Sequence, residues 1–360
     1  MENRYPMNKA GGIAKVSGFI TAAIRLPPPS AIFASMRILI IKMTSLGDVV
    51  HLLPALTEAA RQVPGLHADW VVEEGFAALP GWHPLVERVI PSALRRWRRG
   101  LGQSATWTEM AAFRRELQAH QYDLVLDAQG LIKSALVARL ADGPRAGLAL
   151  GSARESLACL AYARRYPAPR ELHAITRNRL LTAQALGYPM GAEAELHYGL
   201  ATPPPFQVAG LAADYVVCLH GTARTEKEYP ESDWVKLLAR IAALGLRVAL
   251  PWGNPREKER AERLAAGLHG AIVLPKLGLA ELGGVIAAAR GVIGVDTGLM
   301  HLAAALRLPG IGLYPATPPG RFGVYAEADA PALINLSRPD ELAPAAVAKA
   351  FASLFAEHRQ

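Results

Sequence analysis

The chain has 360 residues, of which 51% are hydrophobic and 19% are charged. These values are typical of a folded protein with room for two domains, and they exclude a disordered tail or a charged polymer. Residues 1–205 carry 23 Lys and Arg against 16 Asp and Glu, whereas residues 206–360 carry 16 against 15. We therefore expect any acidic partner to meet the front half of the chain. The two cysteines, Cys159 and Cys218, are isolated in sequence, which predicts neither a disulfide nor a zinc site and fits a reducing cytoplasm.

Residues 1–35 come before the first strong strand pattern, which opens at Met36. The apolar segment Ser17–Ile24 follows three basic residues, as in a signal peptide, but it stops at Arg25 and three prolines. It is also shorter than the roughly 18 apolar residues that a membrane span needs. We predict that residues 1–35 are a disordered extension or a misassigned start, outside the fold.

From Met36 onward, short apolar runs alternate with helix-length segments, a pattern typical of doubly wound parallel sheets. The predicted strands of the first half are Arg37–Lys42, Asp69–Val72, Glu87–Ile90 and Asp123–Gly130. Those of the second half are Tyr215–His220, Arg247–Trp252, Ala271–Leu274, Gly291–Asp296 and Gly310–Pro315.

A Pro-rich stretch, ATPPPF, separates the two halves at residues 201–206, where neither a helix nor a central strand can continue. We predict α/β domains at residues 36–200 and 213–360, joined by a linker at residues 201–212, with the last helix packing back on the first domain. Two such domains face each other across a cleft at the carboxyl ends of their strands, where open α/β sheets bind ligands.

The turn after the first predicted strand reads TSLGDVV and contains Gly47 and Asp48. Gly47 suits a tight strand-to-helix turn. Asp48 sits where an N-cap carboxylate accepts backbone N–H groups, and capping alone would explain it. The alternative is catalytic, because a carboxylate at the carboxyl end of a strand faces the cleft and can take a proton from an acceptor hydroxyl. No GxGxxG sequence is present here, which argues against a nicotinamide or flavin cofactor.

The second half repeats this geometry in GVIGVDTGLMHL, where a strand leads into Asp296-Thr297-Gly298 and a helix that carries His301. The backbone N–H groups and the positive dipole end of that helix predict a phosphate or pyrophosphate site. The structural alternatives are a helix cap for Asp296 and a hydrogen-bonded interior residue for His301.

A further loop, HGTARTEKEYP, follows the first predicted strand of the second half and offers Thr222 and Lys227. A hydroxyl and an ammonium group on one loop suit the binding of a diphosphate. Taken alone, Lys227 also fits an ordinary solvated lysine, since lysines are mostly exposed.

Together these stretches resemble the heptosyltransferases of lipopolysaccharide inner-core synthesis, glycosyltransferase family 9. The resemblance runs from Met36 to about Leu354, and it is carried by MRILIIKMTSLGDVVHLLPAL, ADWVVEEGF, RVIPSALRRWRR, YDLVLDAQGLIKSALVARL, HGTARTEKEYPESDW, LPWGNPREKERAERLA and VDTGLMHLAAAL. It implies the glycosyltransferase B fold, two Rossmann-like domains facing an interdomain cleft. The stretches VVEEGF and RVIPSALRRWRR favour the members that add the first heptose over heptosyltransferase II.

The resemblance also implies roles for individual residues, with Asp48 matching the catalytic base. The positions that match the donor site are Thr222, Lys227, Glu257, Leu277, Asp296, Thr297, Gly298 and His301. Among them, Glu257 corresponds to the carboxylate that binds the adenosine ribose. Two positions depart from the family pattern, Ala223 in place of a hydroxyl residue and Leu277 in place of a methionine. Both changes are small enough to keep the donor.

The implied reaction is inverting transfer of heptose from ADP-L-glycero-D-manno-heptose to a Kdo sugar of Kdo-lipid A. No DxD-type carboxylate pair offers a site for a divalent metal. We therefore expect Lys227, Thr222 and the helix N-terminus to balance the diphosphate charge, without a metal or a cofactor. The alternatives are heptosyltransferase II or another family member with a different acceptor, a non-catalytic nucleotide-sugar-binding relic, and an epimerase of the same two-domain plan.

The densest basic run of the chain, RRWRR at residues 95–99, is either a solvated face or part of an acceptor site. Arginine pairs well with the carboxylates and phosphates of the implied acceptor. We expect the acceptor to contact Arg95, Arg98, Arg99, Lys133 and Arg154, with Trp97 at the bilayer interface. The protein is then expected to be cytoplasmic and peripheral on the anionic cytoplasmic face of the inner membrane, with no nucleic-acid partner.

Overall fold

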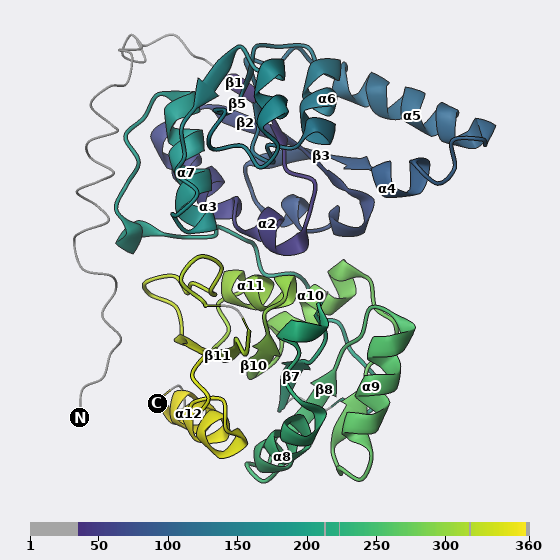
Figure 1. Cartoon of the computed structure of the whole chain (residues 1–360), viewed down its shortest axis with the longest axis vertical. Coiled ribbons are helices and arrows are strands. Elements are labelled where there is room, and N and C mark those ends of the chain that lie inside the picture. The colour runs from purple at the N-terminus through teal and green to yellow at the C-terminus, as the bar shows by residue number, and fades with distance from the viewer. Residues whose placement is uncertain (1–34, 212–213, 223, 317, 358–360) are drawn as a thin grey trace.

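Figure 1 shows the computed structural model of the chain, in which two α/β halves are stacked along the long axis. The structure describes residues 35–211, 214–222, 224–316 and 318–357. Residues 1–34 of the predicted extension and the departure at Ala223 therefore lie outside the described residues. Each half is built on a six-stranded sheet, in the orders β3-β2-β1-β4-β5-β6 and β12-β11-β10-β7-β8-β9. The predicted α/β class with two Rossmann-like halves is confirmed.

All neighbouring strands of the first sheet pair in parallel. Its strands are β1 (Met36–Ile41), β2 (Leu66–Glu73), β3 (Val86–Ser92), β4 (Leu124–Asp127), β5 (Arg145–Leu148) and β6 (Arg164–Tyr166). Its helices are α2 (Leu46–Val50), α3 (Leu53–Gln62), α4 (Leu94–Trp97), α5 (Ser104–Leu117), α6 (Ile132–Leu140) and α7 (Ala174–Leu186). The last four residues of β1 are fully buried because helices cover both faces of the sheet. Ile38 and Ile40 share a core with α3 and α7, whereas Leu39 and Ile41 share one with α5 and α6.

The strands of the second sheet also pair in parallel. They are β7 (Tyr215–Leu219), β8 (Arg247–Leu250), β9 (Ala271–Val273), β10 (Gly291–Val295), β11 (Gly310–Leu313) and β12 (Leu333–Leu336). The helices are α8 (Glu231–Ala242), α9 (Pro255–Ala265), α10 (Leu279–Ala287), α11 (Gly298–Ala305) and α12 (Pro344–Glu357). Short 3₁₀ helices lie at Glu74–Phe76, Pro80–Trp82, Ser156–Ala161 (η3), Glu193–Glu195 and Thr225–Lys227 (η5). Among the described residues, no helix combines the length and the apolar character needed to cross a membrane.

The last helix, α12, packs on α8 and β11 of its own half. Its side chains Val347, Phe351 and Leu354 are buried in the core that β10 and β11 also line. This differs from the expectation that the last helix packs back on the first half, because the apolar face of α12 is already buried within the second half.

The two halves meet where α2 contacts α11, at the junction visible in Figure 1. A Cβ atom added to Gly298 would lie 2.8 Å from the backbone nitrogen of Gly47 and 2.9 Å from Leu46 Cβ. Glycine at position 298 therefore lets the first turn of α11 lie directly on α2. Because α2 follows β1 and α11 follows β10, the segments at the carboxyl ends of these two interior strands touch each other.

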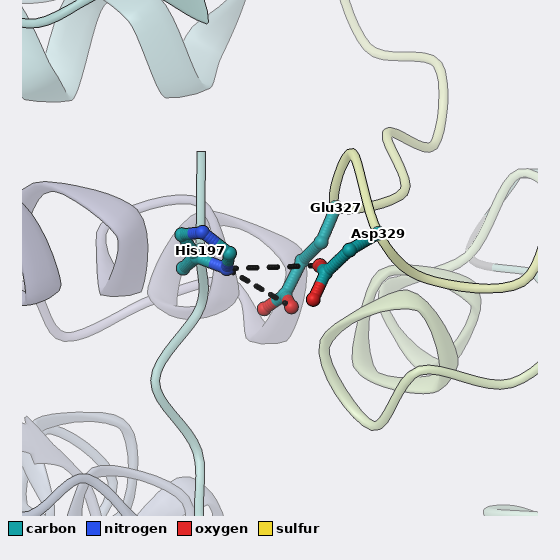
Figure 2. Close-up of side chains that lie close together, drawn as sticks. All are labelled: His197, Glu327 and Asp329. Atoms are coloured by element: carbon teal, nitrogen blue, oxygen red, sulfur yellow. Dashed lines mark hydrogen bonds and ion pairs between the residues drawn. The ribbon is translucent and has the colours of Figure 1, made fainter. Parts of the chain in front are cut away.

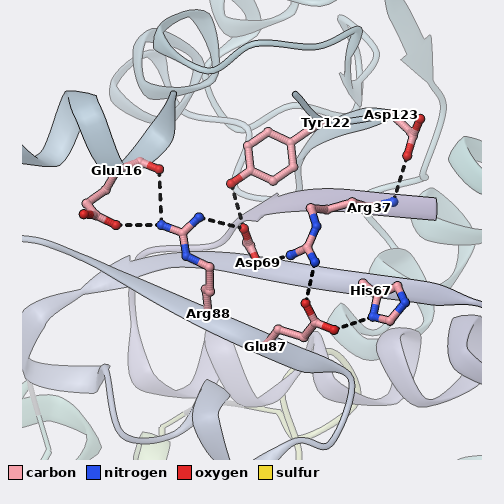
Figure 3. A network of polar contacts seen from close by, with 8 residues as sticks. All are labelled: Arg37, His67, Asp69, Glu87, Arg88, Glu116, Tyr122 and Asp123. Atoms are coloured by element: carbon pink, nitrogen blue, oxygen red, sulfur yellow. Dashed lines mark hydrogen bonds and ion pairs between the residues drawn. The ribbon is translucent and has the colours of Figure 1, made fainter. Parts of the chain in front are cut away.

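A network of polar side chains ties β1, β2 and β3 together around Asp69, which is fully buried (Figure 3). The Asp69 carboxylate accepts hydrogen bonds from Tyr122 Oη at 2.8 Å, Arg37 Nη1 at 3.1 Å and Arg88 Nη1 at 3.4 Å. Arg37 also donates to Glu87, at 2.6 Å. A buried carboxylate is stable only when it is paired in this way, so the network is a structural element of the first half.

Candidate active site

Asp48 lies on α2, at the junction of the halves, and is partly exposed. Its Oδ2 atom accepts hydrogen bonds from the backbone N–H of Ser45 at 2.7 Å and from the Ser45 hydroxyl at 3.1 Å. Ser45 is the N-cap of α2, so Asp48 is the third helical residue of a capping box and the predicted N-cap position is wrong. Among the described residues none donates to Oδ1, which leaves that oxygen able to accept a proton.

The loop before α2 is held by two side chains that the sequence analysis missed. Gln129 Oε1 accepts hydrogen bonds from the backbone N–H groups of Met43 at 3.0 Å and Thr44 at 3.1 Å. Lys42, directly after β1, is buried, and its Nζ donates to the carbonyl oxygen of Ala128 at 2.7 Å. Burial lowers the pKa of Lys42, and the charge of nearby Asp48 opposes that shift. A lysine directly after a buried strand was a signal that could have identified this residue.

The predicted diphosphate residues lie together in the second half. Lys227, at the end of η5, pairs with Asp296 through Nζ and Oδ2 at 2.5 Å. Thr222 Oγ1 donates to the backbone carbonyl of Asp296 at 3.0 Å. The Lys227 side chain is 23% exposed, so its ammonium group is reachable by a ligand that competes with Asp296.

The predicted ribose residue, Glu257, lies in the first turn of α9 next to the loop that carries Thr222. Its Oε2 accepts the backbone N–H of Gly253 at 2.7 Å. A Cβ atom added to Gly221 would lie 2.8 Å from the Glu257 carboxyl carbon, so the loop after β7 and the first turn of α9 are in direct contact. Leu277 is half-buried against the main core just before α10, and Thr297 is the N-cap of α11.

His301 belongs to a cluster of three histidines at the junction of the halves. His51, at the end of α2, lies with its Nε2 atom 3.1 Å from His301 Nδ1, and the ring of His173 lies 5.6 Å from that of His51. Burial lowers the pKa of His301 to about 4, while the charges of Asp296 and Asp48 oppose this shift. Burial likewise lowers the pKa of His173 to about 4 and that of His51 well below its usual value. The sequence pattern does not identify His51 or His173 as site residues, although His51 follows Asp48 by one helical turn.

The basic run at residues 95–99 is only partly available to a ligand. Arg96 pairs with Glu74 at 2.9 Å and with Glu109 at 2.8 Å. Trp97 is 5% exposed and donates its Nε1–H to Glu109 at 2.7 Å, so the expectation that Trp97 lies at a bilayer interface is wrong. The physical reason is that Trp97 packs on Phe113 of α5 as part of the core. Arg95, Arg98 and Arg99 are exposed, and within the described part of the chain they form no ion pair.

The other two predicted acceptor residues lie on α6 and in the loop before η3. Lys133, in the first turn of α6, has its Nζ 3.4 Å from Thr44 Oγ1, next to Ser45 and Asp48. Arg154 is exposed in the loop before η3. The following residue, Glu155, accepts the backbone N–H of Ile132 at 2.7 Å, which places this loop at the start of α6.

A third group of charged side chains, His197, Glu327 and Asp329, has the composition of a metal site (Figure 2). Arg307 already donates to both carboxylates, and the backbone N–H of Tyr198 donates to Glu327 at 2.6 Å. These bonds satisfy the buried carboxylate without an ion. The group therefore ties the segment around His197 to the loop after β11, with the Arg307 guanidinium as the cation shared by the two carboxylates.

The sequence profile of glycosyltransferase family 9 (heptosyltransferase) matches residues 110–343. The chain is 51% identical over 291 residues to lipopolysaccharide heptosyltransferase 1 of Pseudomonas aeruginosa, and the alignment covers 81% of each protein. The solved structure of E. coli heptosyltransferase WaaC with ADP matches with a TM-score of 0.78 and 44% identity, over 89% of this chain and 99% of that one. WaaC with ADP-2-deoxy-2-fluoro heptose matches with a TM-score of 0.75 and 42% identity, over 90% and 100%. By this family match, these identities and the shared fold, the chain belongs to glycosyltransferase family 9, the heptosyltransferases.

Proposed function

We propose that this enzyme transfers heptose from ADP-heptose to a Kdo sugar of Kdo-lipid A in lipopolysaccharide inner-core synthesis. The similar proteins named above support the donor, since one WaaC structure holds ADP and another holds an ADP-heptose analogue. The observation that carries the proposal is the contact between Gly47 and Gly298. It sets Asp48, the candidate base, beside the first turn of α11, the candidate phosphate site.

In the proposed reaction, a Kdo hydroxyl attacks the anomeric carbon of the heptose. Asp48 takes the hydroxyl proton on Oδ1, the oxygen that the capping box leaves free. The bond from the anomeric carbon to the diphosphate oxygen breaks on the opposite face, and ADP leaves with the electron pair. Displacement from the opposite face inverts the anomeric centre.

The leaving diphosphate gains negative charge, which Lys227 and the free N–H groups at the start of α11 are placed to balance. Lys227 is paired with Asp296. Donor binding is then an exchange in which the ammonium group turns from the carboxylate to the diphosphate. Because these groups supply the positive charge, we propose that the reaction needs no divalent metal.

The acceptor is proposed to lie along the first half, with its anionic groups at Arg95, Arg98, Arg99, Lys133 and Arg154. Lys133 is the best placed of these, because its bond to Thr44 brings an ammonium group next to the Asp48 loop. A lipid acceptor with a charged head group also requires the enzyme to work at a membrane surface, which we propose is the cytoplasmic face of the inner membrane.

The decisive experiment incubates the enzyme with ADP-heptose and chelator, with and without Kdo-lipid A, and measures ADP release and the acceptor mass. We expect ADP release only with the acceptor, and a product heavier by one heptose. Turnover only with an already heptosylated acceptor would indicate heptosyltransferase II activity. Interconversion of the donor without an acceptor would indicate an epimerase, and binding without turnover would indicate a relic. Loss of all activity with chelator would contradict the metal-free mechanism.

A further inference from the structure

The first half carries an exposed apolar surface between α6 and η3, which we call the α6–η3 patch. On α6, Ile132, Leu136 and Leu140 follow one another at every fourth position and therefore form a single stripe, and all three are exposed. On η3, Leu157 and Leu160 are 65% and 66% exposed. Soluble proteins rarely gather five large aliphatic side chains on one exposed surface without a binding partner.

Buried side chains beneath the patch hold α6 and η3 together. Ala135 of α6 packs against Ala158, Cys159 and Tyr162 beneath the surface, so the two helices are held side by side. Between them lies a shallow groove of about 330 Å³ that is lined almost entirely by aliphatic side chains. Arg139 is the one charged residue in the lining of this groove. The exposed side chains of Leu136, Leu157 and Leu160 therefore do not contribute to the buried core.

The chain segment that builds the patch is basic. Residues 132–165 contain six Lys and Arg but two Asp and Glu. Four of the arginines, Arg139, Arg154, Arg164 and Arg165, are exposed. An apolar surface with a basic surround complements an anionic lipid bilayer, whose head groups pair with arginine while its interior accepts leucine. A second copy of the chain would bring like charges together, which disfavours a symmetric dimer on this surface.

The patch also lies next to the candidate active site. Its first residue, Ile132, is followed by Lys133, whose Nζ lies 3.4 Å from Thr44 Oγ1 in the loop that leads to Asp48. We propose that the α6–η3 patch docks the enzyme on an anionic lipid bilayer and presents the acceptor head group to Asp48. This inference rests on the proposed lipid acceptor and assigns the membrane contact to a surface other than the basic run at residues 95–99.

The test compares the double variant Leu157→Ser/Leu160→Ser with the wild type in sedimentation with vesicles of phosphatidylethanolamine and phosphatidylglycerol. The matched control is Val235→Ser/Leu244→Ser, which removes two exposed aliphatic side chains from the second half. We expect the double variant to bind these vesicles about tenfold more weakly, with no change for the control, since each leucine contributes through its buried apolar area. Vesicles of neutral phosphatidylcholine should bind the wild type more weakly than the anionic vesicles. Equal melting temperatures establish that the variants are folded.

A second measurement separates this inference from the proposed function. Transfer to a fully deacylated, soluble form of Kdo-lipid A should be unchanged in the double variant, whereas transfer to Kdo-lipid A in vesicles should fall. If the double variant bound vesicles as tightly as the wild type, the proposed docking surface would be overturned, even if transfer to the soluble acceptor is normal. Conversion of a wild-type dimer to monomers by the double variant, with vesicle binding intact, would overturn it in favour of self-association. Failure of the wild type to use the soluble acceptor would contradict the proposed acceptor. The vesicle-binding measurement would still test whether the α6–η3 patch is the docking surface.

Discussion

His51 of the first half and His301 of the second form a hydrogen bond across the junction, with 3.1 Å between Nε2 and Nδ1. The other ring nitrogen of His51, Nδ1, is buried and has no hydrogen-bond partner among the described residues. A buried N–H without an acceptor is rarer in proteins than a buried acceptor without a donor, so the proton of His51 belongs on Nε2. His301 then accepts on Nδ1 and carries its own proton on Nε2. The bond thus fixes the tautomer of a predicted donor-site residue and joins the two halves.

The histidine cluster predicts a loss of stability in mild acid. The folded-state pKa of His173 and of His301 is about 4, against 6.5 in the absence of burial. The unfolded chain therefore binds protons at a higher pH, and stability that is full above about pH 6.5 is lost as the pH falls toward 4. We expect the melting temperature to fall from about pH 7.5 to about pH 5, and to fall less in His173→Gln. The control is His269→Gln at an exposed position. If the melting temperature of His173→Gln fell as much as that of the wild type, protonation of His173 would not be a cause of the acid sensitivity.

The fold could be predicted from the sequence because its strongest signals are local. The run MRILII is aliphatic throughout, so β1 is evident without its neighbours. In contrast, β5, β6 and β12 were missed. Arg145–Leu148 is four residues long and contains a single large aliphatic side chain, Arg164–Tyr166 carries two arginines, and Leu333–Leu336 is short and paired on one side only. Their strand conformation depends on the neighbouring strand and not on their own pattern.

The candidate site could be predicted only in part for a related reason. Three site residues lie in turns whose sequence motifs can be recognised, namely Asp48, Lys227 and Asp296. The partners of His301 come from far along the chain, His51 being 250 residues away, and no spacing rule connects them. The opposite error concerns Trp97, whose four arginine neighbours suggested exposure, whereas the ring packs on Phe113.

Lys227 is expected to act on both donor binding and turnover. Lys227→Ala removes the ammonium group and leaves Asp296 as an unpaired carboxylate beside the diphosphate, so binding of ADP-heptose should weaken and kcat should fall as well. We expect kcat/KM for the donor to fall by about 100-fold or more, consistent with the loss of a charged hydrogen bond and added repulsion. Lys236→Ala, at an exposed lysine of α8, is the control. A change in thermal stability alone would make Lys227 a structural residue.

Three exposed arginines are expected to act on the acceptor alone. Arg95→Ala, Arg98→Ala and Arg99→Ala combined should raise the apparent KM for Kdo-lipid A about tenfold and leave that for ADP-heptose unchanged. Arg96→Ala serves as the comparison, because Arg96 is bound to Glu74 and Glu109. An equal change in the apparent KM of both substrates, or no change in either, would show that residues 95–99 are a solvated surface and not part of the acceptor site.

Asp69 is expected to contribute to stability and not to activity. Asp69→Ala leaves Arg37, Arg88 and Tyr122 without their shared acceptor, which should lower the free energy of unfolding by about 3 kcal/mol. Asp340→Ala, which breaks an exposed pair with Arg338, should change it by less than about 0.5 kcal/mol. Urea unfolding measures both, and similar small effects would contradict the role given to the network.

Asp48 has an observed capping role and a proposed catalytic role, and two variants separate them. Ser45→Ala removes the capping partner but keeps the carboxylate, so it should cost about 1 kcal/mol of stability and leave kcat within a few-fold of wild type. Asp48→Asn keeps the size of the side chain but removes the base.

The most direct test of the mechanism is kcat for heptose transfer to Kdo-lipid A by Asp48→Asn, measured with ADP-heptose binding on the same protein. We predict that kcat falls by about 10²–10⁴-fold while the dissociation constant of ADP-heptose changes little. A near-normal kcat in Asp48→Asn would contradict the account and return Asp48 to helix capping.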